Sequence, residues 1–165
     1  MTRGVEKKYN LLEQHEIDYL NKLCENYVAD TFQIYNMQTI KRDELLEFKS
    51  KIVEYVTSIY GSRYDLKPMW LNKVTPEDEG SDKFHFDQAV LSIVTYFNLD
   101  FEGGEFEYID ENNNKVIINP EINLSLIMND TLWHRIRKVT SGTRFSLVAF
   151  FKLIDKYDKK EKTLL

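Results

Sequence analysis

The sequence predicts a single, mainly β domain: an antiparallel double sheet or barrel with helices packed outside it. Its 165 residues suit one domain of ordinary size. An apolar share of 42 %, with 10 Tyr and 10 Phe, is enough for a hydrophobic core. Apolar residues have helical spacing in the first third of the chain and fall into short β-type segments from Trp70 onward. We therefore expect one domain over 1–165, with helical support over about 11–62 and a β core over about 68–152.

Two helices are expected in the helical support. In LLEQHEIDYLNKLCENYV the apolar residues at helical spacing are Leu12, Ile17, Leu20, Leu23 and Tyr27. In RDELLEFKSKIVEYVTSIYG they are Leu45, Phe48, Ile52, Val56 and Ile59. Gly61 follows the second pattern as a stop signal. The polar stretch TFQIYNMQTIKRD between them is left unassigned.

The β core is expected to hold about eight short strands, because β-branched and aromatic runs alternate with turn signals such as DFEGGE, DENNNK and TSGT. The expected strands are 69–74, 83–87, 90–98, 104–109, 115–118, 124–128, 132–138 and 143–152. The acidic loop at 76–82 is expected to be a solvated turn, with a flexible lid as the alternative. The tail DKYDKKEKTLL is charged and need not be ordered.

Charge and composition exclude several classes of protein. The net charge of −5 argues against extended nucleic-acid binding, which depends on Lys and Arg neutralising phosphates. No apolar run is long enough for a transmembrane helix, so no membrane partner is expected, and MTRGVEKKYN lacks the apolar segment of a secretory signal. The single cysteine, Cys24, cannot form an internal disulfide and suits a reducing compartment. A soluble, cytoplasmic protein is therefore expected.

The segment KFHFDQAV carries a histidine and a carboxylate two residues apart. In a strand, residues i and i+2 point to the same face, so His85 and Asp87 would project together while Phe86 points away. A nitrogen and a carboxylate oxygen side by side can fill two adjacent corners of a metal coordination sphere. His134, in TLWHRIRKV, is the candidate third ligand. Two histidines and one carboxylate on one face of an iron leave the opposite positions open, as in non-haem Fe(II) oxygenases.

A candidate anion site follows the third ligand along the chain. In SGTRFSLVAFF, Arg144 and Ser146 would point to the same face of a strand. A buried Arg is costly unless an anion lies opposite it, and a guanidinium is well suited to clamping a carboxylate. Tyr96, expected on a neighbouring strand, has a phenol that could reach the same anion.

Each candidate also has a purely structural interpretation. The alternatives are a core histidine for His85, an ion-pair partner for Arg144, a small barrel residue for Ser146 and a packed sheet aromatic for Tyr96. The combination of His85, Asp87, His134 and Arg144 favours the metal site, because buried polar groups need partners. Arg135 and Arg137 are expected to face solvent, with a basic rim for an acidic substrate as the alternative.

The motifs HFD, YFNLDFEGGEFEY and HRIRKVTSGTRFSLVAFF resemble the 2-oxoglutarate- and Fe(II)-dependent dioxygenases, in the branch of prolyl 4-hydroxylases and procollagen lysyl hydroxylases. The resemblance covers about residues 68–152 and implies a double-stranded β-helix, or jelly roll. It also implies that His85, Asp87 and His134 bind iron. Arg144, ten residues after the distal histidine, would bind the distal carboxylate of 2-oxoglutarate, and Tyr96 matches a tyrosine that often contacts this cosubstrate.

The resemblance further implies an enzyme that uses Fe(II), 2-oxoglutarate and O2, with ascorbate as a further candidate. Its expected reaction is hydroxylation of a C–H bond, on a prolyl or lysyl side chain of a peptide or protein. Two alternatives stay open: a hydroxylase of a free amino acid, small metabolite or nucleobase, and a catalytically idle β-helix that serves as a binding module. One departure from the family is the upstream strand MWLNKVTP, which lacks the tyrosine often found there. Trp70 or Asn72 is expected to face the pocket instead.

Overall fold

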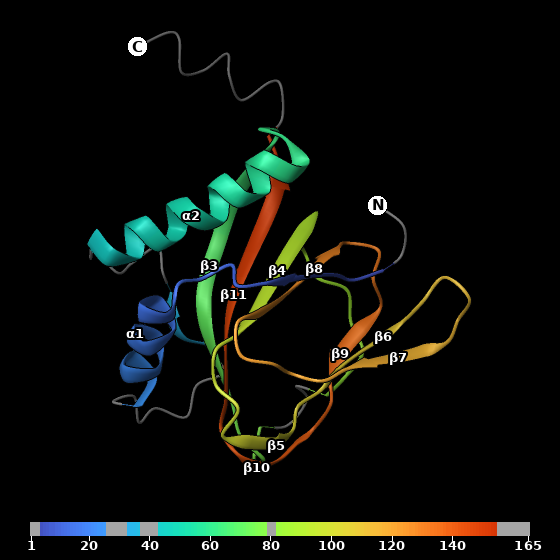
Figure 1. Cartoon of the computed structure of the whole chain (residues 1–165). Coiled ribbons are helices and arrows are strands. Elements are labelled where there is room, and N and C mark those ends of the chain that lie inside the picture. Colours follow the sequence, from blue (N-terminus) through green and yellow to red (C-terminus); the bar gives the residue numbers. More distant parts are fainter. Residues whose placement is uncertain (1–3, 26–32, 37–42, 79–81, 155–165) are drawn as a thin grey trace, which may run out of the picture.

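A computed structural model describes residues 4–25, 33–36, 43–78 and 82–154 of the chain. Within these ranges the chain forms helices α1 (Gln14–Glu25) and α2 (Asp43–Tyr60) and a set of antiparallel strands (Figure 1). The strands are β1 (Glu6–Tyr9), β2 (Gln33–Asn36), β3 (Tyr64–Val74), β4 (Leu91–Tyr96), β5 (Phe101–Gly103), β6 (Phe106–Ile109), β7 (Lys115–Ile118), β8 (Leu124–Asn129), β9 (His134–Ile136), β10 (Val139–Gly142) and β11 (Arg144–Leu153). In the described part of the chain, neither helix is long and apolar enough to cross a membrane.

The strands are arranged in three sheets. The large sheet has six strands in the order β1-β8-β4-β11-β3-β2, a second sheet has the order β7-β6-β9, and β10 pairs with β5. Figure 1 shows the two helices on one side of the large sheet and the three-stranded sheet on its other side. The predicted class, a mainly β double sheet with helices outside, is confirmed.

The large sheet is buried on both faces, which creates two hydrophobic cores. On one face, Leu71 of β3 packs in a cluster with Leu20 of α1 and Ile52 of α2. On the other face, Trp70 of the same strand packs in a cluster with Phe106 of the three-stranded sheet. Neighbouring residues of β3 point to opposite faces and so serve different cores. Burying one large apolar side chain contributes about 2 kcal/mol to the free energy of folding. The central strand β4 is buried along its whole length.

Local signals set the helix ends. The Glu16 carboxylate accepts a 2.6 Å hydrogen bond from the Glu13 backbone N–H, which satisfies a donor at the start of α1. The same carboxylate accepts a 2.7 Å bond from Lys51 and so joins α1 to α2. Gly61 ends α2 with a φ of +86°, and its N–H donates to the carbonyl of Thr57, as the sequence predicted. Residues 26–28, the end of the first expected helix, lie outside the described residues.

Two glycines shape the small β5–β10 pair, and β11 begins two residues beyond it. Gly103 has a φ of +75° and Gly142 a φ of +72°, in the left-handed region that favours glycine. A Cβ on Gly103 would lie 2.2 Å from the carbonyl oxygen of Lys138, and one on Gly142 would lie 2.1 Å from that of Asp100. The backbones therefore approach too closely at both positions for any side chain.

The expected strands are confirmed with one exception. Residues 83–87 do not form a strand: among the described residues they make one isolated bridge, between His85 and His134. The partner strand β9 is only three residues long and uses its other edge to pair with β6, so a longer ladder has no partner here. His85 and Asp87 therefore do not project together from a strand, as predicted, although their side chains do converge.

Four strands were not predicted: β1, β2, β5 and β10. They lie in short or polar stretches without clear alternation, because edge strands need no continuous apolar face. The acidic loop at 76–82 begins with a turn, in which the Asp78 carboxylate accepts a 2.6 Å hydrogen bond from the N–H of Thr75, the residue before the loop. Residues 79–81, on which the lid alternative depends, and the tail at 155–165 lie outside the described residues.

Candidate functional site

Three side chains that could hold a metal ion converge at one end of the space between the two sheets. One donor atom from each of His85, Asp87 and His134 lies within 4.8 Å of the other two. The Asp87 Oδ1 atom is 3.7 Å from His85 Nε2 and 3.6 Å from His134 Nε2. Because metal–nitrogen and metal–oxygen bonds are about 2 Å long, one ion can contact all three donors with small shifts of the side chains.

The two imidazoles present the nitrogen that a metal needs. His85 Nδ1 lies 2.9 Å from the carbonyl oxygen of Lys83, and His134 Nδ1 lies 3.0 Å from that of Leu132. A carbonyl oxygen can only accept, so each Nδ1 carries the hydrogen and each Nε2 keeps its lone pair. Metal-ligating histidines are commonly held in this way by a backbone carbonyl. The tautomers therefore fit a shared ion next to Asp87.

The backbone and a stacked ring fix the position of His134. His134 is buried, and its ring stacks on Phe106 with centroids 5.2 Å apart. Burial lowers the pKa of His134, while the nearby Asp87 carboxylate opposes that effect. The lowered pKa favours the neutral imidazole, which is the form that binds metal ions. His85 is more open, with 49 % of its side chain exposed, so the triad lies at the solvent side of the site.

A cavity of about 150 Å³ leads from the triad into the space between the sheets. Its walls come from β3, β4, β6, β9 and β11 and are mostly apolar. Besides the triad, they comprise Trp70, Asn72, Val74, Val94, Phe106, Ile136, Arg144, Ser146, Val148 and Phe150. Such a chamber shields a reactive centre from water and leaves a few polar groups to orient a ligand.

Arg144 supplies a buried positive charge to this cavity. The residue is 1 % exposed, and its Nη1 donates a 3.2 Å hydrogen bond to Ser146 Oγ. Its Nε and Nη2 have no hydrogen-bond partner among the described residues. An uncompensated buried cation is costly, so the arrangement calls for an anionic ligand with two oxygens to fill the open donors. The structural alternative, an ion pair of Arg144 with a carboxylate of the protein, has no support in the described part of the chain.

Neighbouring residues leave room for the guanidinium and add further polar groups. Arg144 lies over the ring of Tyr96, 4.9 Å from its centroid. The Tyr96 hydroxyl is buried without a partner among the described residues, so it remains free to bind a ligand. Gly104, with a φ of +68°, makes room for Arg144, because a Cβ at this position would lie only 3.0 Å from the Arg144 side chain. Ser146 faces the cavity, as its spacing from Arg144 predicted.

The strand upstream of the triad contributes Trp70 and Asn72 to the cavity wall. The Trp70 indole N–H donates to the Asn72 side-chain oxygen. The Trp70 ring also meets Phe150 of β11 edge to face, with centroids 4.8 Å apart. Trp70 and Asn72 thus face the cavity from the strand in which the family that the motifs resemble often has a tyrosine. This is the orientation that the sequence predicted.

Three aromatic residues next to the ligand histidines in the chain, Phe84, Phe86 and Trp133, pack together as an aromatic rim that was not predicted. Phe86 and Trp133 are 51 % and 40 % exposed, and their ring centroids are 4.5 Å apart. Phe84 stacks on Trp133 at 6.1 Å. The signal available in the sequence was that each candidate histidine ligand has an aromatic residue directly beside it.

On the Phe86 side of this rim lies an open groove of about 480 Å³. This groove shares Trp70, Asp87 and Phe150 with the wall of the inner cavity, so the two lie side by side. Phe86 and Lys152 also line it. A molecule lying in the groove would therefore pass directly beside the triad.

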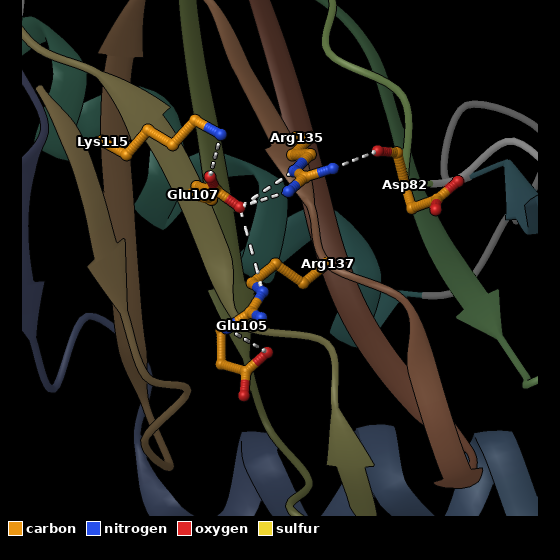
Figure 2. Close-up of polar contacts among 6 residues, drawn as sticks. All are labelled: Asp82, Glu105, Glu107, Lys115, Arg135 and Arg137. Carbon is orange, nitrogen blue, oxygen red and sulfur yellow. Dashed lines mark hydrogen bonds and ion pairs between the residues drawn. The ribbon is translucent and has the colours of Figure 1, made fainter. Parts of the chain in front are cut away.

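A buried carboxylate on the outer face of the three-stranded sheet was also missed. Glu107 of β6 is 3 % exposed, and Figure 2 shows it between Lys115, Arg135 and Arg137. Arg135 Nε and Nη2 donate to Glu107 Oε2 at 2.9 and 2.7 Å. The expectation that Arg135 and Arg137 face solvent is therefore only partly correct, because both keep some exposure but pair with this carboxylate.

Comparison with solved structures shows a shared fold. A viral collagen prolyl hydroxylase from Paramecium Bursaria Chlorella virus-1 superposes with a TM-score of 0.70 at 18 % identity, covering 92 % of this chain and 90 % of that one. A prolyl-4-hydroxylase from Pseudomonas putida gives 0.69 at 14 % identity, with 93 % and 94 % covered. The non-heme alpha ketoglutarate dependent epimerase SnoN from nogalamycin biosynthesis gives 0.70 at 10 % identity, with 91 % and 78 % covered.

At identities of this size the likeness shows the fold alone. The chain has the fold of 2-oxoglutarate and Fe(II) oxygenases, and the expected double-stranded β-helix is confirmed. Scans of the sequence against protein-family models and against curated proteins find no match. A function for this protein is therefore inferred from the chemistry of the site.

Proposed function

We propose that the protein is a 2-oxoglutarate-dependent Fe(II) dioxygenase that hydroxylates an unactivated C–H bond. One observation carries the proposal: a cavity with a two-histidine, one-carboxylate triad at its open end also contains a buried arginine with two unfilled donors. The triad is the ligand set of non-haem Fe(II) oxygenases. The open donors of Arg144 suit the distal carboxylate of a dicarboxylic acid.

Each residue has a defined part in this proposal. His85, Asp87 and His134 would hold the iron through Nε2, a carboxylate oxygen and Nε2. Arg144 would pair with the distal carboxylate of 2-oxoglutarate, and Ser146, already bonded to Arg144 Nη1, would orient the guanidinium. When bound, the iron would supply the oxidising chemistry, which converts 2-oxoglutarate and O2 to succinate and CO2 and delivers one oxygen atom to the substrate.

Tyr96 would donate a hydrogen bond from its phenolic hydroxyl to the same carboxylate. Its hydroxyl is buried beside Arg144 and lacks a partner, and such a group is costly unless a ligand completes it. The apolar walls would exclude water from the reacting atoms. Ascorbate is a candidate for restoring iron that becomes oxidised in turnover without substrate, and it would act from solvent at the exposed side of the triad.

For the substrate, we propose a prolyl side chain in an extended peptide. The groove beside the triad is open, with a volume of about 480 Å³, and its aromatic walls suit the flat, apolar faces of proline rings. A lysyl side chain is the second candidate in this class. Lys152 lines the groove and would repel a lysyl ammonium, which favours the neutral prolyl ring.

Two other functions remain as outcomes of the test. A small-molecule hydroxylase would use the same iron site, and the epimerase SnoN, with a similar TM-score, carries its own chemistry on this fold. A catalytically idle binding module would need no metal, and the unfilled donors of Arg144 argue against it.

The test is release of succinate from 2-oxoglutarate by the Fe(II)-loaded protein, measured with no substrate, with a proline-rich peptide, with a lysine-containing peptide and with a panel of free amino acids and nucleosides. Stimulation by the proline-rich peptide, with a mass gain of one oxygen on that peptide, is expected. Stimulation by a free metabolite alone would move the assignment to the small-molecule class. Absence of both metal binding and succinate release would leave the binding module and overturn the proposal.

A further inference from the structure

We propose that Arg135 is a positioning residue that clasps the two metal-ligand segments together from outside the site. This inference rests on the proposed iron site but concerns residues that would not touch the iron. The backbone link between the two segments is short. Among the described residues, the segment with His85 pairs with β9 only through the bridge to His134, with hydrogen bonds of 2.8 and 3.1 Å.

Arg135 follows His134 in β9, so its side chain points to the opposite face of the strand. On that face the guanidinium contacts the other ligand segment twice. Nη1 lies 3.4 Å from the carbonyl oxygen of Asp82, and Cζ lies 4.7 Å from the centre of the Phe84 ring (Figure 2 shows the contact with Asp82). Asp82 and Phe84 lie just before His85 in the same segment. One side chain therefore joins the backbone beside His134 to the backbone leading to His85.

Glu107 anchors this guanidinium. Two Arg135 nitrogens donate to one Glu107 oxygen at 2.9 and 2.7 Å, and Glu107 is the direct cross-strand partner of Arg135. The carboxylate is almost fully buried, so the pair is shielded from solvent and holds its geometry better than a surface ion pair would. The neighbouring residue of β6, Phe106, stacks on His134 on the other face. β6 thus supports the ligand histidine with one residue and the clasp with the next.

The consequence of this arrangement is preorganisation. Without the clasp, the His85 segment would keep its bridge to His134 and the packing of Phe84 and Phe86 on Trp133, but lose the contacts with Arg135 that further restrain its approach. Metal affinity depends on all three donors being held near their bound positions, and loss of outer supporting contacts commonly weakens binding by about 10- to 100-fold.

Arg135→Gln and Arg137→Gln form a matched pair for the test. Both remove one positive charge, from β9 or from the residue directly after it, and one partner from Glu107, but Arg137 pairs with Glu105 and Glu107 rather than with the His85 segment. Anaerobic titration with Fe(II), and with Co(II) as a spectroscopic probe, would measure the metal Kd of each folded variant. We expect Arg135→Gln to raise the Kd about 10-fold and Arg137→Gln to leave it within about twofold of the parent protein.

Arg135→Lys separates positioning from charge balance. A lysine keeps the charge beside buried Glu107 but cannot also reach the Asp82 carbonyl and cover the Phe84 ring with a planar group. If Arg135 only neutralises Glu107, the lysine variant restores the metal Kd. If it acts as a clasp, the lysine variant recovers thermal stability but not metal affinity.

Amide hydrogen exchange of the metal-free protein gives a readout that does not depend on iron. Exchange at the His85 and His134 N–H groups, which form the bridge, is expected to speed up in Arg135→Gln and not in Arg137→Gln. If Arg135→Gln does not fold, Phe84→Leu removes the ring beneath the guanidinium, together with its stacking on Trp133, and is expected to show at least the same exchange effect. Equal exchange and equal Kd in all variants would overturn the clasp. If the parent protein binds no metal, the proposed function fails while the exchange measurement still decides this inference.

Discussion

The backbones of His85 and His134 are joined by a reciprocal pair of hydrogen bonds, 2.8 Å from His85 N to His134 O and 3.1 Å in the other direction. This bridge brings residues 49 positions apart in the chain, 134 less 85, into one site. It also sets the ring centroids of the two histidines 4.5 Å apart, so that both Nε2 atoms face Asp87. In the described part of the chain, this pair of hydrogen bonds is the backbone link between the two segments that carry the candidate metal ligands.

Replacement of Asp87 or His134 by alanine is expected to abolish Fe(II) binding, because two donors alone hold an exchangeable divalent ion weakly. Isothermal titration under anaerobic conditions would measure the loss. His15→Ala is the matched control, since His15 is an exposed histidine at the start of α1 and should leave the metal Kd unchanged. Unchanged Fe(II) binding in His134→Ala would show that the triad is not the metal site.

Arg144→Met is expected to weaken 2-oxoglutarate binding by about 10- to 100-fold, because a charge-assisted pair is worth about 1.5–3 kcal/mol. The measurement is the 2-oxoglutarate Kd of the metal-loaded protein without O2. Arg63→Met, at an exposed position, controls for loss of one positive charge. A Kd that does not change in Arg144→Met would show that the distal carboxylate binds elsewhere.

The same Arg144→Met substitution is expected to stabilise the ligand-free protein. Arg144 is buried with two unfilled donors, and a long apolar side chain removes that uncompensated charge. Ser146 Oγ loses one hydrogen bond, which offsets part of the gain. We expect a net increase of about 1–2 kcal/mol in the free energy of unfolding, measured by urea denaturation without 2-oxoglutarate. A decrease would mean that Arg144 has a structural partner in the free protein.

Phe86→Ala and Trp133→Ala are expected to raise the KM for a proline-rich peptide, because exposed Phe86 lines the groove and exposed Trp133 packs against it. The turnover of 2-oxoglutarate in the absence of peptide should stay the same, since neither ring belongs to the triad or the anion pocket. Ile117→Ala, another exposed apolar residue, serves as the comparison on β7. A fall in peptide-free turnover equal to the loss with peptide would argue that the rim supports the iron site rather than the substrate.

Stability is expected to fall at high pH because of Cys24. Burial raises the pKa of the Cys24 thiol from 9.0 to about 12 in the folded protein. Between these values the unfolded chain has lost the proton while the folded chain keeps it, so rising pH favours unfolding across that window. Unfolding curves of the parent protein and Cys24→Ala at pH 8 and pH 10.5 would check this. The destabilisation on raising the pH should be smaller in Cys24→Ala, and an equal loss in both would assign the effect to other groups.

Much of the architecture could be predicted from local patterns. The helical spacing that includes Ile17 and Ile52, and the alternation of short β segments after Trp70, report which faces are buried, and burial is what the periodicity of a sequence encodes. The edge strands β1, β2, β5 and β10 escaped prediction because an edge needs backbone partners but no continuous apolar face. The segment at 83–87 was assigned to a strand because its composition is β-like, yet β9, its partner strand in the described part of the chain, is too short to form a ladder.

The sequence by itself determined the chemistry on offer: two histidines, one aspartate and one arginine in an order and spacing typical of an iron and dicarboxylate site. Only the tertiary structure decided that these groups meet, that the arginine is buried with open donors, and that Glu107 and Arg135 support the site from the opposite face. The physical reason is that these relationships depend on contacts between segments far apart in the chain. Such contacts are set by strand register and packing, which leave no periodic trace in the local order of residues.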